Sequence, residues 1–257
     1  IEQRLSREKH PNKMFFSYAN TVATIDFAKQ FKGHGWVGIS YQIEPDEAYN
    51  EIILHIRFKE TDIRLQQETL GILGVNLIYG AYYKNDDPKR LLRYLYDHLD
   101  KDQLEIDTIN FSGPRFADVD NRLMSLQLVK NGMTDAVMFN PDGKNILPAA
   151  ILYKKNILAF RGSFRPVTKV NMDMYEKSLK MFVNENKVEK ENTLVVFEIT
   201  LSNLRSDGEI DERDFMDRAE LLCSLGQTVM ISNFQEYHKV VEYFSNYTKA
   251  RVGLAMG

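Results

Sequence analysis

Residues 161–171 hold the groups of this chain that are best suited to bind an anion. The stretch reads RGSFRPVTKVN and combines a glycine, two hydroxyls and three basic side chains: Gly162, Ser163, Thr168, Arg161, Arg165 and Lys169. A glycine lets a phosphate approach the backbone, and the start of a following helix offers unpaired N–H groups and a positive dipole end. On spacing alone, the favoured interpretation is an ordinary turn, in which Asn171 caps a helix that opens at Asn171 or Met172.

Apolar strands and amphipathic helices that alternate along the second half of the chain would position this stretch. Strands are expected at 156–160, 193–200 and 227–232, each followed by a helical pattern. Because these strands are apolar on both faces, they predict a parallel sheet with helices on both faces. Ligands bind beyond the carboxyl ends of such strands, so Ser202 and Arg205 are expected to flank the anion-binding stretch. A (β/α) barrel is the alternative fold, since alternation does not distinguish an open sheet from a closed one.

The first part of the chain has a different pattern. Residues 36–58 contain two runs that alternate at period two around the turn-rich PDEAYN, which predicts an antiparallel hairpin. Helical spacing follows at 60–83, and a second helix is expected to start at the cap Asp87. We therefore predict a mixed α+β domain at 1–150 and an α/β domain at 151–257.

Residues 162–182, GSFRPVTKVNMDMYEKSLKMF, resemble the first motif of the nucleotidyltransferases that make phosphopantetheine and pyridine-nucleotide adenylates. That motif reads G-[ST]-F-D-P-hydrophobic-[HT]-x-G-H and is followed by an amphipathic helix. The order of elements in residues 155–257 is similar to that of the family, including a Glu-Arg pair at Glu212 and Arg213. The resemblance implies a Rossmann-like fold, ATP with Mg²⁺ as cofactor and a phosphate-bearing acceptor.

The sequence departs from the family motif at groups that act on phosphate. The motif's aspartate is Arg165, and its Gly-His pair falls on Val170 and Asn171. The family's histidine stabilises the phosphates in the transition state, whereas asparagine carries no charge. Two functions stay open: an adenylyltransferase acting on a phosphate-bearing acceptor, or a non-catalytic nucleotide-sensing or scaffold protein. In either case the candidate nucleotide- and phosphate-binding residues are Gly162, Ser163, Arg165, Thr168, Asn171, Ser202 and Arg205.

A second resemblance competes with the first. LVVFEITLSNLRSDG at 194–208 is similar to the first motif of haloacid-dehalogenase-type phosphatases, and VMISN at 229–233 is similar to their second. Glu198 would then occupy the position of the nucleophilic aspartate, and Thr200 the position of the second aspartate. Glutamate is longer than aspartate and would misplace the attacking oxygen, so this interpretation is the weaker one.

No metal site is predicted from the sequence. Asp118 and Asp120 could form a metal pair, but a helix start capped by aspartate is the favoured account. FSGPR at 111–115 could add to an anion site, and an ordinary turn explains it as well. The five histidines lack metal-ligand spacing; His34 is expected in a turn and His55 on a strand, with no partner visible in the sequence.

Composition limits the class of partner. The 257 residues carry a net charge of -3 with a pI near 6.0, which gives no overall attraction to nucleic acid or to an anionic membrane. A small-molecule nucleotide or phosphate is the ligand that the nucleotidyltransferase resemblance implies. The apolar run at 70–83 is too short and glycine-rich to cross a bilayer. The single cysteine, Cys223, has the spacing of a buried structural thiol and suits a reducing, cytoplasmic compartment. Because the chain starts at Ile1, we expect a piece of a longer protein.

Overall fold

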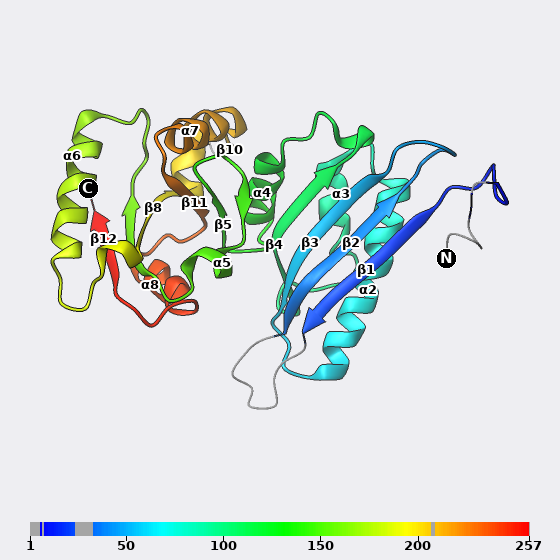
Figure 1. The fold of residues 1–257 in the computed structure, drawn as a ribbon, viewed down its shortest axis with the longest axis horizontal. Helices are drawn as coiled ribbons and strands as arrows, with labels where there is room; N and C mark the ends of the chain where they lie inside the picture. Colours follow the sequence, from blue (N-terminus) through cyan, green and yellow to red (C-terminus); the bar gives the residue numbers. More distant parts are fainter. Residues whose placement is uncertain (1–5, 7, 24–32, 207–208, 257) are drawn as a thin grey trace. The chain divides into compact units, whose positions relative to one another are not determined.

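The computed structural model describes residues 6, 8–23, 33–206 and 209–256 (Figure 1). The chain divides into two compact units: unit 1 spans Ile1–Met133 and unit 2 spans Thr134–Gly257. The division lies before the boundary expected near residue 150. The reason is that the short strands which follow Thr134 pair within the sheet of unit 2.

Unit 1 is built on a four-stranded antiparallel sheet. Its strands, in sheet order, are β1 (Phe16–Ala23), β2 (His34–Tyr41), β3 (Asn50–Phe58) and β4 (Leu104–Ser112). β2 and β3 form the predicted hairpin, in which His34 lies opposite Arg57 and Tyr41 lies opposite Asn50. The hairpin prediction is confirmed. The placement of His34 in a turn was wrong, because His34 is the first residue of β2.

Helices cover one face of this sheet. They are α2 (Ile63–Tyr83), α3 (Pro88–Tyr94) and α4 (Asn121–Lys130), and the 3-10 turn η1 (Pro114–Phe116) follows β4. Asp62, Asp87 and Asp120 each cap a helix by accepting backbone N–H groups of its first turn. The cap at Asp87 is the one expected, and Asp120 serves as a cap, as the favoured account held. Buried residues of β2 and β3, among them Val37, Ile39, Ile52 and Leu54, form the core of this unit.

Unit 2 is built on a six-stranded, mostly parallel sheet in the order β12-β7-β8-β11-β5-β6. Its strands are β5 (Ala136–Phe139), β6 (Asn145–Ile146), β7 (Asn156–Arg161), β8 (Thr193–Thr200), β11 (Thr228–Ser232) and β12 (Val252–Met256). β12, β7, β8 and β11 pair in parallel, as predicted, whereas β5 pairs antiparallel with β11 and β6 antiparallel with β5. The sheet is open, so the alternative of a (β/α) barrel was wrong.

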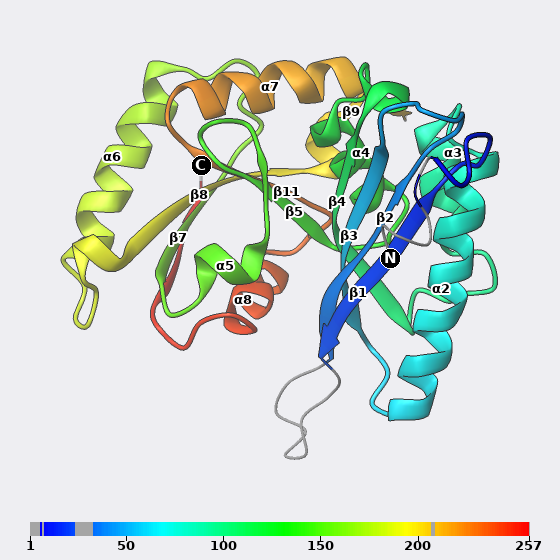
Figure 2. The same cartoon turned by 45° about the vertical axis from the view of Figure 1, so that its right-hand side comes forward.

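Helices lie on both faces of the unit 2 sheet (Figure 2). α6 (Lys169–Val183) and α7 (Glu212–Ser224) cover one face, and α5 (Pro148–Leu152) and α8 (Tyr237–Ser245) cover the other. Alternate residues of each strand enter the two cores. Ile157, Ala159, Val196 and Met230 pack with Val240 and Phe244 of α8, whereas Phe139 contacts Phe215 of α7 and Phe197 contacts Tyr175 of α6.

Short elements complete unit 2. They are the 3-10 turns η2 (Lys190–Asn192) and η3 (Leu201–Leu204) and the two-stranded pair β9 (Arg205–Ser206) and β10 (Glu209–Ile210). Cys223 is buried in α7, as its spacing predicted. Among the residues that the structure describes, no helix has the length and apolar character needed to cross a membrane.

Candidate functional site at the carboxyl edge of the unit 2 sheet

The loop after β7 is held to the sheet by a buried aromatic ring. Phe164 is 2% exposed and packs against Phe160 and Phe197, with ring centroids 5.5 and 5.4 Å away. Its φ of 47° lies in the left-handed region, which a residue with a side chain adopts at a cost. Gly162 is required by this packing, because a Cβ there would lie 2.9 Å from the Phe164 ring. The motif glycine therefore has a structural role.

A charged clamp on α7 joins the loops that follow β7 and β8. Arg218 is 4% exposed and donates from Nη1 to the carbonyl oxygens of Ser163 (2.8 Å) and Asn203 (2.9 Å). Asp214 accepts from Arg218 Nε at 2.9 Å and also pairs with Arg165 at 3.5 Å. The Asn203 amide donates to the Gly162 carbonyl at 3.4 Å. Neighbouring parallel strands thus deliver their loops to one edge, as the sequence predicts.

Helix α6 begins earlier than the sequence analysis placed it. Thr168, not Asn171, is the N-cap, and its Oγ1 accepts the N–H of Asn171 at 3.3 Å. The Asn171 Oδ1 accepts the Thr168 N–H at 2.8 Å, which completes a capping box. With Asn171 as the cap, the sequence would turn the N–H groups at 171–173 towards a ligand, and this expectation is wrong for Asn171 and Met172, which both donate to Thr168. The N–H groups that lack an acceptor within the helix therefore belong to the residues that precede Asn171.

Ser202 and Arg205 lie on the loop after β8, but the bonds that join the two loops use Asn203 instead. The Ser202 hydroxyl is 2.7 Å from the hydroxyl of Thr200, and Arg205 opens the β9–β10 pair. Ser163, Arg165, Thr168, Ser202 and Arg205 are all exposed at this edge. The structure brings the Gly162–Ser163 turn together with η3 and leaves Arg205 outside the joined loops.

A buried ion pair lies beneath these loops. Glu198 of β8 is fully buried, and its two oxygens accept from Arg161 Nη2 (2.7 Å) and Nε (2.9 Å). The Ser232 hydroxyl donates to Glu198 Oε1 at 2.6 Å, and the Arg161 guanidinium stacks 4.7 Å from the ring centre of Tyr237. Sequence reasoning missed Ser232 and Tyr237. The usable signal was the single carboxylate inside the apolar strand LVVFEIT.

These groups lie where the sheet changes the direction of its connections. The chain leaves β8 towards α7 on one face and leaves β11 towards α8 on the other, although the two strands are parallel neighbours. Such a switch point is the usual position of a ligand crevice in an open α/β sheet. Glu198 comes from β8 and Ser232 from β11, so the hydrogen bond between them joins the two strands at this edge. Because Glu198 is fully buried, it holds the edge in place and does not itself contact a ligand.

We found no metal centre in the part of the chain that the structure describes: no three His, Cys, Asp or Glu side chains gather there in a way that could hold an ion. The arrangement offers the exposed hydroxyls of Ser163, Thr168 and Ser202 and the exposed basic residue Lys169 beside the joined loops, together with the first N–H groups of α6. These groups donate hydrogen bonds and positive charge, so an anionic ligand is the chemistry that they suit.

The capping box yields a first prediction. Thr168→Ala is expected to lower the free energy of unfolding of unit 2 by about 1 kcal/mol, because the Asn171 N–H loses its acceptor. Asn171→Ala is expected to cost less, since the cap itself remains. Chemical denaturation, monitored by alkylation of the buried Cys223, measures both changes in the free energy of unfolding. A larger loss for Asn171→Ala would place the cap at Asn171 after all.

Comparison of the chain with protein-family models, with curated proteins and with solved structures gives no match. The geometry of the carboxyl edge therefore carries the functional argument.

Proposed function

We propose that unit 2 binds a nucleotide or another phosphate-bearing ligand at the carboxyl edge of β7, β8 and β11. The observation that carries the proposal is the joining of the loops after β7 and β8 through Arg218, which donates to Ser163 and Asn203. This clamp presents the Ser163 side chain beside the start of α6 at the edge where α/β sheets bind ligands. As part of this proposal, we assign the six-stranded sheet of unit 2 to the Rossmann-like type that nucleotidyltransferases have.

Binding without adenylyl transfer is the version that the geometry favours. Asn171 stands where the nucleotidyltransferase motif that this stretch resembles has its histidine, and its Oδ1 accepts both the N–H and the hydroxyl of Thr168 at 2.8 Å. A side chain engaged in this way holds the helix start and brings no positive charge to a phosphate. Unit 2 would then act as a nucleotide sensor or scaffold, with ATP and Mg²⁺ as the first ligand to test.

A phosphatase of the haloacid-dehalogenase type is disfavoured by the burial of Glu198. Its side chain has no exposed area, and both of its oxygens accept hydrogen bonds from Arg161. A nucleophile must have an oxygen within reach of the substrate phosphorus. Glu198 is therefore assigned a structural role.

Thermal-shift titration with a panel of nucleotides tests the proposal. A ligand at a hundredfold excess over its Kd is expected to stabilise the wild type by about 2.7 kcal/mol. Ser163→Trp should abolish that shift, because an indole would fill the space beside the joined loops. Ser245→Trp is the matched control: Ser245 is exposed at the end of α8, which leads to the opposite edge of the sheet, and this variant should respond like the wild type.

An assay for pyrophosphate separates binding from transfer. With ATP and either nicotinamide mononucleotide or phosphopantetheine, no pyrophosphate is expected from a chain that still shows the thermal shift. Release of pyrophosphate would establish the adenylyltransferase instead. A nucleotide response that is equal in the wild type and in Ser163→Trp would refute the site.

A further inference from the structure

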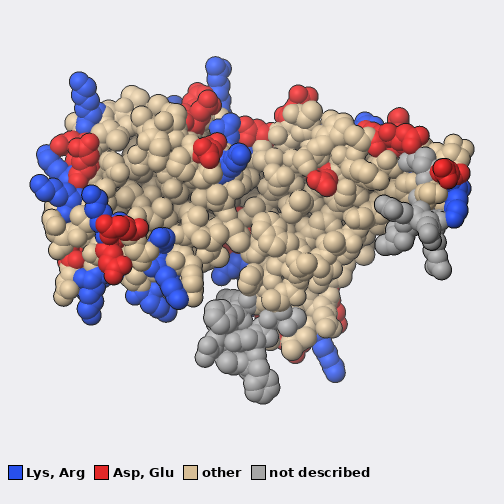
Figure 3. Space-filling model, viewed as in Figure 1, with Lys and Arg blue, Asp and Glu red and all other residues tan. Residues whose placement is uncertain are grey.

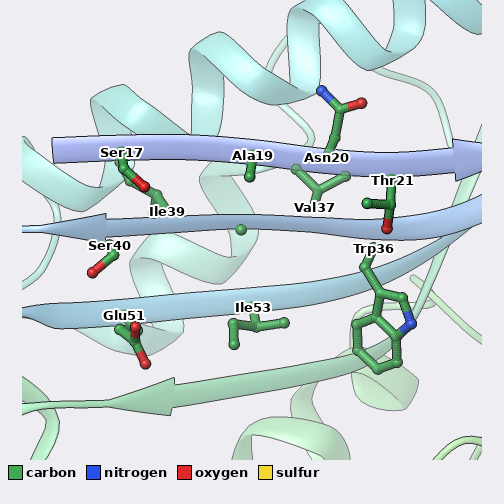
Figure 4. A pocket seen from close by; sticks show the side chains of 11 residues that line it. Ser17, Ala19, Asn20, Thr21, Trp36, Val37, Ile39, Ser40, Glu51 and Ile53 are labelled. Atoms are coloured by element: carbon green, nitrogen blue, oxygen red, sulfur yellow. The ribbon is translucent and has the colours of Figure 1, made fainter. Parts of the chain in front are cut away.

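Strand β1 leaves one edge of the unit 1 sheet open. It is the outermost strand of the order β1-β2-β3-β4, and no strand in the part of the chain that the structure describes pairs with its other side. Figure 4 shows β1 lying beyond β2 and β3, with Ala19 near its middle. An edge strand of eight residues presents a row of backbone N–H and C=O groups with which another strand can pair.

The pairing of β1 with β2 determines which residues of β1 offer these groups. Gln42 donates its N–H to the carbonyl of Phe15, and from Phe16 opposite Tyr41 the register then continues without a shift. In an antiparallel pair, residues that bond to the neighbouring strand alternate with residues whose N–H and C=O groups point the other way. The residues of β1 that point to the open edge are therefore Phe16, Tyr18, Asn20 and Val22.

The two edges of this sheet differ in how they are protected. β4, at the other edge, carries Glu105 and Asp107, and at its bulge Asp107 Oδ1 lies 2.7 Å from His55 Nδ1. The N–H of Ile106 on β4 donates to the carbonyl of Met133. Charged residues and bulges are devices that stop an edge strand from pairing with another chain. β1 has neither, because FSYANTVA contains no charged residue and its register has no shift.

We infer that β1 pairs with the β1 strand of a second copy of this chain. The pairing is antiparallel about a two-fold axis at Ala19, because this register matches the four edge-facing residues with one another. Phe16 then lies opposite the partner's Val22, and Tyr18 opposite the partner's Asn20. Each side chain keeps the face that it has in its own sheet, since these positions all lie on one face of the strand. The two four-stranded sheets become one continuous sheet.

The side chains of β1 complement one another in this register. On the face that α2 covers, Phe16 meets the partner's Val22, and a cross-strand pair of an aromatic and a β-branched residue is stabilising. The Phe16 ring lies 6.2 Å from the Tyr82 ring of α2, yet Phe16 is 51% exposed, so it has area left for a partner. On the outer face the hydroxyl of Ser17 meets that of the partner's Thr21, which is another favourable cross-strand pair.

The lack of charge at this edge favours a second copy over a different protein. A two-fold axis places identical strands against each other, so a charged residue near the axis would face a like charge, whereas a different partner could be selected by opposite charges. Residues 69–83 of α2 are also uncharged, and among them Gly74 lies against Tyr18 of β1 and Val75 is 66% exposed. Figure 3 shows that the surface over the strands of the unit 1 sheet is mostly uncharged on this side. Pairing stops at two copies, because the protected β4 strands form both edges of the joined sheet.

The molar mass in solution, measured by light scattering, tests the inference. Interfaces of standard size have micromolar or lower Kd values, so at about 0.1 mM the wild type should show twice the 29.9 kDa of one chain. Ala19→Lys and Ala19→Glu should each halve the measured mass, because two like charges then meet at the axis. Ala19 is exposed, so neither variant disturbs the core. An equimolar mixture of the two variants should regain the doubled mass, because opposite charges then meet.

Hydrogen exchange of the backbone amides gives a second readout. The amides of Ser17 and Thr21 bond to β2 and should exchange slowly in every variant. The four amides that face the open edge, at positions 16, 18, 20 and 22, should be slow in the wild type and about tenfold faster in Ala19→Lys, because only the pairing of two copies protects them.

Asn110→Lys is the matched control. Asn110 is exposed on β4 and lies opposite Ile53 on the outer face, so this variant should keep the doubled mass. A wild type with the mass of one chain, a mixture of the two Ala19 variants that stays at that mass, or fast exchange at the four edge-facing amides would each overturn the inference. A doubled mass that is lost in Asn110→Lys and kept in Ala19→Lys would also overturn it, by placing the contact at β4.

Discussion

Arg161→Met is expected to lower the free energy of unfolding of unit 2 by about 3–5 kcal/mol, because it leaves a buried charge without its partner. Glu198 is fully buried, and Arg161 supplies two of the hydrogen bonds that its oxygens accept. Water cannot replace these donors at a position without exposed area. The expected loss is a large part of the stability of a domain of this size.

Alkylation of Cys223 during chemical denaturation measures this loss in unit 2 alone. Cys223 is the single cysteine of the chain and is buried in α7, so its labelling reports the opening of unit 2. Trp36, the single tryptophan, lies in unit 1 and gives a separate signal. Two probes are needed because a chain with two compact units need not unfold in one step.

Two comparison variants define the cause of the loss. Adding Glu198→Leu to Arg161→Met removes both charges, so most of the stability should return, less about 1 kcal/mol for the Ser232 hydroxyl that loses its acceptor. Lys177→Met breaks an exposed pair with Asp173 and should cost no more than about 0.5 kcal/mol. If Arg161→Met costs no more than Lys177→Met, the Arg161–Glu198 pair is solvated rather than buried.

The parallel core of unit 2 was predictable because each of its strands can be recognised from its own short stretch of sequence. β7, β8, β11 and β12 are short runs, apolar on both faces and separated by helical patterns, and this alternation requires parallel strands with crossovers. The direction of β5 was not predictable in this way. A four-residue apolar run looks the same in either direction, and only its pairing with β11 shows that it is antiparallel and belongs to unit 2.

The start of α6 shows how local signals can compete. Thr168 and Asn171 are both good caps, and they lie three residues apart. The structure uses both, Thr168 as the cap and Asn171 as the returning partner. A sequence of this kind predicts that a helix starts here, but the choice of cap depends on the path of the preceding loop.

The two charged networks escaped prediction because they join residues far apart in the chain. Arg161 and Glu198 are 37 residues apart, and His55 and Asp107 are 52 residues apart. Each contact depends on strand register, and the second also depends on a bulge. A shift of register by one residue would turn either side chain to the other face of its sheet. Residue types alone, such as the single carboxylate in the apolar strand LVVFEIT, therefore did not show which partners these side chains contact.

Phe164→Ala is expected to destabilise unit 2 by about 3–5 kcal/mol and also to abolish the nucleotide response. The ring of Phe164 is the buried anchor of the loop that carries Ser163, and it packs between Phe160 and Phe197. Phe182→Ala is the matched control. Phe182 is a buried ring of α6 that packs near Gly253 and Leu158, away from that loop, so this variant should lose a similar stability but keep the response.

Phe164→Gly separates the contribution of the ring from that of the backbone. Both variants lose the ring, but glycine adopts the φ of 47° without the steric cost that alanine bears. Phe164→Gly should therefore be more stable than Phe164→Ala by about 1 kcal/mol, which reverses the usual order of these two residues. Alkylation of Cys223 during denaturation measures the difference. Equal stabilities would mean that the loop leaves the left-handed backbone conformation at position 164 once the ring is gone. The packing of the ring alone would then hold the loop in its observed conformation.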